Sequence, residues 1–169
     1  MKLPIKQILL ENIMDINRLD KKYGNQFSDS ILNNIHQQKF GSTLTPEEIE
    51  EYRKTSNIVF NLDKSNPTGF IRTKQFTPDD QANIRFFHAL NDNLKIQPDR
   101  INYISNLAST QKGTGKLLLN KIDHNGNPIL LKAWNKDLIP YYKAHGFQQL
   151  IHPELRGKLN MYKLNEEQK

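Results

Sequence analysis

The chain has 169 residues, no cysteine and a formal net charge of +6 at pH 7. This length is typical of one domain with a full hydrophobic core, so we expect a single domain over residues 1–169. The lack of cysteine excludes disulfides, thiol catalysis and cysteine metal sites, and no metal site is predicted. No apolar run approaches membrane-spanning length, and residues 1–5 lack the apolar core of a secretion signal, so we expect a soluble, cytoplasmic protein with no membrane partner.

The first 60 residues predict strand and helix in alternation. Residues 3–8 alternate weakly and indicate a strand, and residues 11–19 show helical spacing of isoleucine and leucine. Residues 27–38 repeat the helical pattern, with Ser28 or Asp29 as the expected N-cap. Thr45-Pro46-Glu47-Glu48 is a stronger helix start, and we expect this acidic helix to run to about Lys54 with a solvated face.

The middle of the chain predicts a hairpin and then a helical insertion. Residues 57–62 and 68–73 alternate as two strands, joined through a turn at residues 63–67. A further helix is predicted within residues 77–98, starting at Thr77-Pro78 and carrying Ile84 and Phe87 on one side. Packing is its expected role, and a lid or a partner-binding helix are the alternatives.

Residues 101–122 carry the motif around which the rest is placed. Residues 101–107 read as a strand, and the glycine and leucines from Gly115 onward fall on one helical face. Two glycines, Gly113 and Gly115, let the backbone turn tightly and expose successive N–H groups at a helix start, where a diphosphate binds well. Lys112 and Lys116 add positive charge beside them.

Spacing separates this motif from other phosphate-binding loops. A nucleoside-triphosphate loop requires glycine where Thr110 stands and serine or threonine where Leu117 stands, so that interpretation fails. A dinucleotide-binding loop requires glycine where Leu118 stands, which leaves that interpretation weak. A structural turn between strand and helix stays open on these residues alone.

A second motif follows about twenty residues later. Residues 128–134 predict a buried strand, Asn135 opens a helix that contains Tyr142, and Gly146-Phe147 ends it. Closing strands are expected at residues 148–151 and 159–164, with a frayed tail at residues 165–169.

Together the two motifs resemble the GCN5-related N-acetyltransferases. The first matches their coenzyme A loop, Gln/Arg-x-x-Gly-x-Gly/Ala, with Thr110 at the Gln/Arg place, and the second matches their ordered Asn135, Tyr142 and Gly146-Phe147. The resemblance implies an α/β (α+β) three-layer fold. It has a mixed, largely antiparallel twisted sheet, a splayed coenzyme-binding strand pair near Leu107 and Leu131, and helices on both faces.

The same resemblance implies transfer of an acetyl group from acetyl-CoA, the cosubstrate, to a primary amine of a small molecule or peptide by direct attack. Tyr142 takes the family role of general acid. The coenzyme-binding residues it implies are Leu107, Ala108, Ser109, Gln111, Lys112, Gly113, Thr114, Gly115, Lys116 and Asn135. The chain up to Phe60 holds eight basic and eight acidic residues, so the whole basic excess lies in the later, coenzyme-binding part. A polyanionic coenzyme accounts for it without RNA or DNA.

Three questions stay open at this level. The coenzyme strand offers Ser105 and Asn106 where many family members use glutamate, so no general base is assigned. A non-catalytic acyl-CoA-binding module is therefore an alternative. A charged-tRNA acceptor, as in the toxin branch of the family, is a further alternative because the closing region carries the basic residues Arg156, Lys158 and Lys163. A homodimer is also left open.

Overall fold

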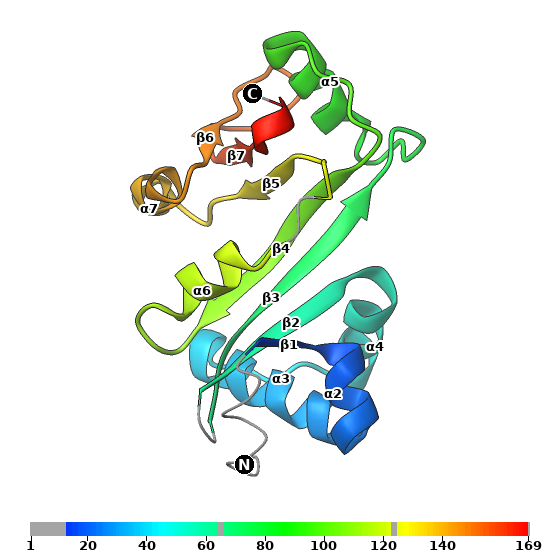
Figure 1. Ribbon diagram of the computed structural model, residues 1–169, viewed down its shortest axis with the longest axis vertical. Helices are drawn as coiled ribbons and strands as arrows, with labels where there is room; N and C mark the ends of the chain where they lie inside the picture. The colour runs from blue at the N-terminus through cyan, green and yellow to red at the C-terminus, as the bar shows by residue number, and fades with distance from the viewer. Residues whose placement is uncertain (1–12, 64–65, 123–124, 169) are drawn as a thin grey trace. The chain divides into compact units, whose positions relative to one another are not determined.

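The computed structural model describes residues 13–63, 66–122 and 125–168. Its strands form one seven-stranded sheet in the order β1-β2-β3-β4-β5-β7-β6 (Figure 1). The chain divides into two compact units. Unit 1 contains the described residues up to Thr73 and Asn106–Ile122, and unit 2 contains Lys74–Ser105 and the described residues after Ile122. The single domain expected over 1–169 stays a prediction.

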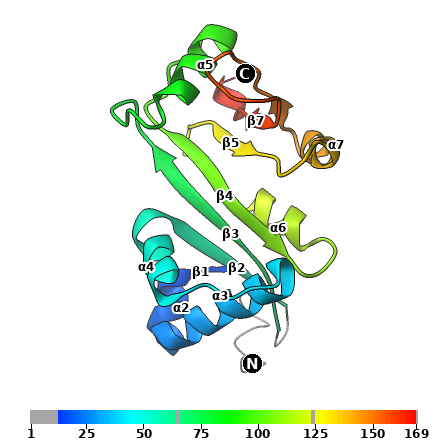
Figure 2. The same cartoon turned by 180° about the vertical axis from the view of Figure 1, so that it is seen from behind.

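Unit 1 has helices on both faces of its strands. Its strands are β1 (Ile13–Asp15), β2 (Asn57–Asp63) and parts of β3 (Asn66–Phe76) and β4 (Ile101–Ser109), and its helices are α2 (Ile16–Tyr23), α3 (Asn25–Phe40), α4 (Pro46–Thr55) and α6 (Thr114–Asn120). Phe70 of β3 lies in the core with residues of α2, α3 and α4. Its neighbour Gly69 faces Thr114 and Leu118 of α6. Because successive strand residues point to opposite faces, α6 covers the other side, as both views show (Figures 1 and 2).

Unit 2 has its own core beneath α5. Its elements, besides the remaining parts of β3 and β4, are α5 (Ile84–Leu94), β5 (Ile129–Lys132), the 3-10 helix η1 (Lys136–Leu138), α7 (Ile139–Ala144), β6 (Gln148–Gln149), β7 (Asn160–Lys163) and the 3-10 helix η2 (Glu166–Gln168). Phe86 and Leu90 of α5 pack with Ile101, Leu130 and Tyr162. Among the described residues, no helix is long and apolar enough to cross a membrane.

The parallel pairing of β4 with β5 is short. It runs from Asn102↔Ile129 to Ile104↔Leu131. Strand β4 continues to Ser109, whereas β5 ends at Lys132 and pairs with β7 along its whole length. The predicted mixed, largely antiparallel sheet is confirmed, since the other described pairs are antiparallel. The splay near Leu107 and Leu131 stays a prediction.

Several predicted boundaries at the start of the chain were wrong. The expected helix over 11–19 is strand β1 followed by α2, because Met14 pairs with Phe60 and the Asp15 side chain then caps α2 by accepting from Arg18 N at 2.9 Å. Helix α3 is confirmed, but it begins after Gly24 and not at Ser28 or Asp29. The strand expected at residues 3–8 lies outside the described residues.

Two later predictions also differ in detail. The helix within 77–98 begins at Ile84 and not at Thr77, because Asp80 closes a turn by accepting from Ala82 N at 3.1 Å and from Asn83. The tail expected to fray forms η2, where Asn165 and Gln168 exchange hydrogen bonds of 3.0 and 3.1 Å. By contrast, the Thr45–Glu48 capping box of α4 is confirmed with both of its bonds.

The approach of β3 to the end of β4 requires glycine at position 69. A Cβ added at Gly69 would lie 2.5 Å from the Ala108 carbonyl oxygen and 2.7 Å from Thr114 Cγ2. Real Cβ atoms essentially never come this close to another heavy atom. The lack of a side chain at Gly69 therefore lets the first turn of α6 sit directly on the sheet.

An ion-pair network fastens the three helices on the other face. Arg53 of α4 donates to Asp20 of α2 at 2.6 and 3.1 Å and to Asp29 of α3 at 2.8 and 3.0 Å. Burial raises the pKa of Asp20, but hydrogen bonds from Arg53 and Ser28 and the charge of Arg53 outweigh it, so that this pKa is lowered. The network is only partly buried, so solvent screening weakens it.

We predict that Arg53→Met lowers the free energy of unfolding by about 1–3 kcal/mol at neutral pH, since two carboxylates lose their partner. A carboxylate with a lowered folded pKa contributes stability above its unfolded pKa, and that stability is lost as pH falls through the folded pKa. Urea unfolding should therefore show the difference from wild type shrinking below about pH 4. Lys54→Met, which removes an exposed pair with Glu50, is the control and should cost less than about 0.5 kcal/mol. A pH-independent difference would contradict this account.

We predict that Gly69→Ala destabilises the protein by about 1–3 kcal/mol, because the Ala108 backbone must move to admit the new methyl group. For a chain of this size, thermal melting should fall by roughly 2–4 °C per kcal/mol. Thr73→Ala on the same strand is the control and should change melting little. Equal melting temperatures for Gly69→Ala and wild type would refute the close approach.

Candidate functional site

The connection from β4 to α6 in unit 1 is anchored at its start by one residue of β3. The Thr110 backbone N–H and hydroxyl both donate to the Thr68 carbonyl, at 2.8 and 3.0 Å. The Ser109 hydroxyl donates to the Gln111 carbonyl at 2.6 Å. These bonds hold the last residues of β4 and the first of the loop in one conformation.

Helix α6 is anchored to the same strand. The Thr114 hydroxyl donates to the Thr68 hydroxyl at 3.2 Å, and the Asn61 amide donates to that hydroxyl at 2.7 Å. Thr114 and Gly115 are buried, whereas Lys112, Gly113 and Lys116 are exposed. The loop therefore has a fixed inner side and an exposed outer side.

Gly113 gives the turn its shape. Its φ of +90° lies in the left-handed region, and a Cβ there would meet nothing within 4 Å. Glycine is needed for the backbone conformation, and the space beside it is open. The Thr114 N–H donates to Gln111 O and the Leu117 N–H to Gly113 O.

The Gly115 and Lys116 N–H groups, which lie between these two bonds, have no acceptor among the described residues. Free N–H groups at the start of a helix are partners for anionic oxygens. The exposed side chains of Lys112 and Lys116 lie on the same short segment. The donor set of this loop therefore fits a diphosphate.

A buried cation lies beneath the coenzyme strand expected from the sequence. Arg72 is 7% exposed and donates to Ser56 Oγ at 2.7 Å, Thr55 Oγ1 at 3.1 Å and Asn106 Oδ1 at 3.1 Å. Its guanidinium lies 3.8 Å from the centre of the Tyr52 ring. Burial lowers the pKa of Arg72, although an arginine stays charged at neutral pH. The Asn106 carbonyl is thus held as an acceptor for this cation, and the amide has no capacity to act as a base.

The sequence did not reveal the roles of Thr68 and Arg72. An arginine in a strand usually reads as a solvated residue, and nothing in its neighbours indicates that α4 covers it. Thr68-Gly69, a small polar residue beside a glycine, is the signal in the sequence that marks a close backbone approach.

The second motif lies in unit 2. Asn135 caps η1, because its side-chain oxygen accepts from the Asp137 N–H at 2.9 Å, and Pro140 stands in the first turn of α7. Among the contacts of the described residues, the role of Asn135 is therefore that of a helix cap. A coenzyme contact of Asn135 stays a prediction.

Tyr142 of α7 is a buried side chain, 9% exposed. Its ring meets those of Tyr141 and Phe147 edge to face, with centroids 5.3 and 5.8 Å away. Burial, followed by the neighbouring Tyr141, raises the pKa of Tyr142. The phenol therefore stays protonated at neutral pH, which is the state a general acid needs.

The predicted site residues thus fall into two groups. Those from Leu107 to Lys116 lie together in unit 1, on the end of β4, the loop and the start of α6, whereas Asn135 and Tyr142 lie together in unit 2 on η1 and α7. Among the described residues, no group of three or more histidine, aspartate or glutamate side chains is arranged to hold a metal ion.

Comparison with known proteins finds similarity in structure only. No protein-family model matches the sequence, and no curated protein matches it. The ribosomal-protein-S18-alanine N-acetyltransferase from Escherichia coli has a TM-score of 0.57 at 13% identity, over 90% of this chain and 92% of that chain.

Two further structures contain coenzyme. The Bacillus subtilis N-acetyltransferase YlbP in complex with coenzyme A has a TM-score of 0.55 at 9% identity, over 79% of this chain and 89% of that chain. Arabidopsis thaliana NAA60 in complex with acetyl-CoA has a TM-score of 0.52 at 16% identity, over 82% and 92%. The fold of this chain is therefore similar to the fold of these N-acetyltransferases.

Proposed function

We propose that the protein is an acetyl-CoA-dependent N-acetyltransferase that acts on a primary amine of a small molecule or peptide. The observation that carries the proposal is the loop Ser109–Lys116 in this fold, with its left-handed Gly113 and the free N–H groups of Gly115 and Lys116. The solved structures of the same fold that contain coenzyme A or acetyl-CoA support it.

In this proposal the backbone of Gln111–Lys116 holds the diphosphate, and Lys112 and Lys116 add charge. The backbone of Leu107–Ser109 orients the pantetheine arm. Bound acetyl-CoA supplies an activated acyl group as a thioester. Tyr142 holds the proton that a departing thiolate needs, and its burial keeps that proton in place at neutral pH.

The acidic residues of α4 are poor candidates for the general base. Glu48 accepts from the Thr45 N–H at 3.0 Å in the capping box, which lowers its pKa, and Glu50 pairs with Lys54 at 3.2 Å. Glu47 and Glu51 remain as exposed carboxylates. Deprotonation of the amine therefore falls to water, to Glu47 or Glu51, or to an acid of another segment.

We predict that Gly113→Val abolishes coenzyme binding, because a branched side chain at this left-handed position distorts the turn and covers the N–H groups. At a coenzyme concentration about one hundred times the dissociation constant, wild type should gain about 2.7 kcal/mol. That gain corresponds to a rise in melting temperature of roughly 5–10 °C with acetyl-CoA or coenzyme A.

Gly41→Val is the matched control for this variant. Gly41 also has a left-handed φ, +78°, with nothing within 4 Å of an added Cβ, and it ends α3. The Gly41→Val variant has the same backbone strain but should keep the full rise in melting temperature that coenzyme causes. No shift in wild type would show that the loop is a structural turn.

We predict that Tyr142→Phe lowers acetyl turnover by about 10²–10⁴-fold with little change in coenzyme affinity, because the ring packing is kept and only the proton is lost. Tyr141→Phe, at the half-exposed neighbouring ring, should keep wild-type turnover. Turnover is measured with labelled acetyl-CoA against polyamines, amino acids, peptides and charged tRNA at two salt concentrations.

The same assay separates the alternatives. Unchanged turnover in Tyr142→Phe would remove this residue from the mechanism. Intact coenzyme binding without acetylation of any amine would favour a binding module. If the label appears only on charged tRNA, and this labelling is lost as the salt concentration rises, the acceptor is a charged tRNA and not the proposed small molecule or peptide.

A further inference from the structure

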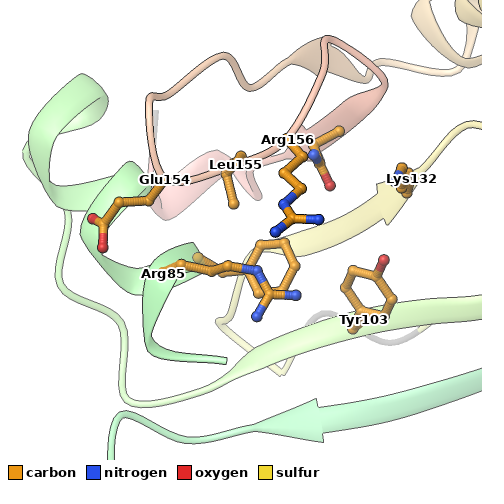
Figure 3. Close-up of a pocket in the computed structure, with 8 residues that line it drawn as sticks. Arg85, Tyr103, Lys132, Glu154, Leu155 and Arg156 are labelled. Carbon is orange, nitrogen blue, oxygen red and sulfur yellow. The ribbon is translucent and has the colours of Figure 1, made fainter. Parts of the chain in front are cut away.

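Unit 2 contains a pocket that the coenzyme loop does not use. Its volume is about 520 Å³, and residues from α5, β4, β5, β7 and the segment between β6 and β7 line it (Figure 3). Lys132 pairs with Asn160 in the sheet, and Tyr103 pairs with Leu130, two residues before Lys132. Directly paired residues share a face, so Tyr103, Lys132 and Asn160 form one floor of the pocket.

The opposite wall is held firmly to α5. His152 contacts Asp92 of α5 at 2.7 Å and accepts from the Glu154 N–H at 3.1 Å. Asn93 of α5 donates to the Ile151 carbonyl at 2.7 Å. The segment that carries Glu154, Leu155 and Arg156 is therefore fixed in place, and the pocket is preformed.

Three cations surround this space without an acid to balance them. Arg85, Lys132 and Arg156 come from three separate segments, and in the described part of the chain no carboxylate lies within ion-pair distance of any of them. The one acid in the lining, Glu154, contacts His88 at 2.9 and 3.1 Å. Figure 3 shows the two guanidinium groups directed toward the same space, while the Glu154 carboxylate points away from it.

The floor offers polar groups that have no internal partner. Asn160 is 5% exposed, and its side-chain amide makes no hydrogen bond to any described residue. The Tyr103 hydroxyl likewise has none, while its ring stacks on Phe76 at 4.9 Å. The Asn160 amide and the hydroxyl of the half-buried Tyr103 therefore reach the open space of the pocket, where a ligand can bond to them.

The remaining lining is apolar, and the space exceeds what one oxyanion fills. Phe86 lies at the wall with Arg85 stacked 4.6 Å above its ring, and Leu155 lies opposite the floor. Volumes of this order are typical of sites for whole small molecules. The ligand therefore has an organic part as well as its charged group.

We propose that this pocket binds a small organic dianion, either a phosphate monoester or a dicarboxylate with an aromatic or aliphatic portion. Arg85 and Arg156 pair with the acidic oxygens, Lys132 adds charge, Asn160 and Tyr103 supply hydrogen bonds, and Phe86 contacts the organic part. The cations converge on one cavity, which suits a small molecule better than an extended nucleic-acid backbone. The proposal does not rest on acetyl transfer.

The test is calorimetric titration of the full chain, without acyl-CoA, at low salt. The probes are phenyl phosphate, phthalate, neutral benzyl alcohol and a single-stranded oligonucleotide. We expect phenyl phosphate or phthalate to bind and benzyl alcohol not to bind, and the stronger of the two anions identifies the acidic group. Binding should weaken as salt rises.

Variants locate the site. Arg85→Gln and Arg156→Gln should each lower the affinity for the anion about tenfold or more, and Asn160→Ala should lower this affinity to a smaller extent. Lys158→Gln removes an exposed cation outside the lining and should leave affinity unchanged. Glu154→Gln removes the one acid and should not weaken binding. Circular dichroism checks that each variant is folded.

The Gly113→Val variant distinguishes this site from the coenzyme loop, because it should no longer bind coenzyme but should bind the anion with unchanged affinity. The absence of binding by both anions would overturn the proposal. So would anion binding that Gly113→Val abolishes and the arginine variants do not change. If the oligonucleotide binds and its affinity falls equally in Lys158→Gln and Arg156→Gln, the cations form a nucleic-acid-binding surface, and the proposal of a small-molecule pocket is overturned.

Discussion

The loop geometry depends on one close contact, the approach of the β3 backbone at Gly69 to the Ala108 carbonyl oxygen. This contact lets α6 begin directly on the sheet. Thr68, the residue before it, then accepts both hydrogen bonds of Thr110 through its carbonyl and the bond from Thr114 through its hydroxyl. Two adjacent residues of one strand thus fix both ends of the loop. The N–H groups of Gly115 and Lys116 are free because they lie in the first turn of α6, where a helix provides no acceptor of its own.

Two cations of unit 1 that are buried or partly buried, Arg53 and Arg72, have different partners. Arg53 has two carboxylates, from Asp20 and Asp29. Arg72 donates to three neutral oxygens and lies over the face of Tyr52, which partly compensate its burial. The exposed cations of the unit 2 pocket, Arg85, Lys132 and Arg156, have no carboxylate partner among the described residues, although Arg85 lies over the Phe86 ring and donates to the Ala82 carbonyl. In this respect they differ from Arg53, which pairs with two carboxylates.

The side chains that a transferase needs are unevenly supplied. A protonated phenol is present in Tyr142, but β4 carries Asn106, whose side-chain oxygen accepts a hydrogen bond from Arg72, at the place where the family resemblance led us to look for a glutamate base. The acids nearest in sequence to an acceptor wall, those of α4, serve partly as a helix cap and as an exposed ion pair. In the proposed reaction Tyr142 is therefore the general acid. The general base is either solvent or a carboxylate other than Glu48 and Glu50.

The sequence by itself determined the long helices α3 and α4, the β2–β3 hairpin and the glycine-containing loop before α6, because each has a local signal: periodicity, a capping box, turn residues or paired glycines. The mixed, largely antiparallel sheet was expected from the family resemblance and not from a local signal. The predicted starts of α2 and α5 were wrong. The Asp15 side chain caps α2 and the Asp80 side chain closes a turn before α5, and hydrophobic periodicity shows neither of these hydrogen bonds. Only the tertiary structure decided that Gly69 faces α6, that Arg72 is buried beneath α4, and that Arg85, Lys132 and Arg156 meet at one cavity. These features join residues far apart in the chain, and the spacing of residues along a sequence carries no information about which distant side chains fold together.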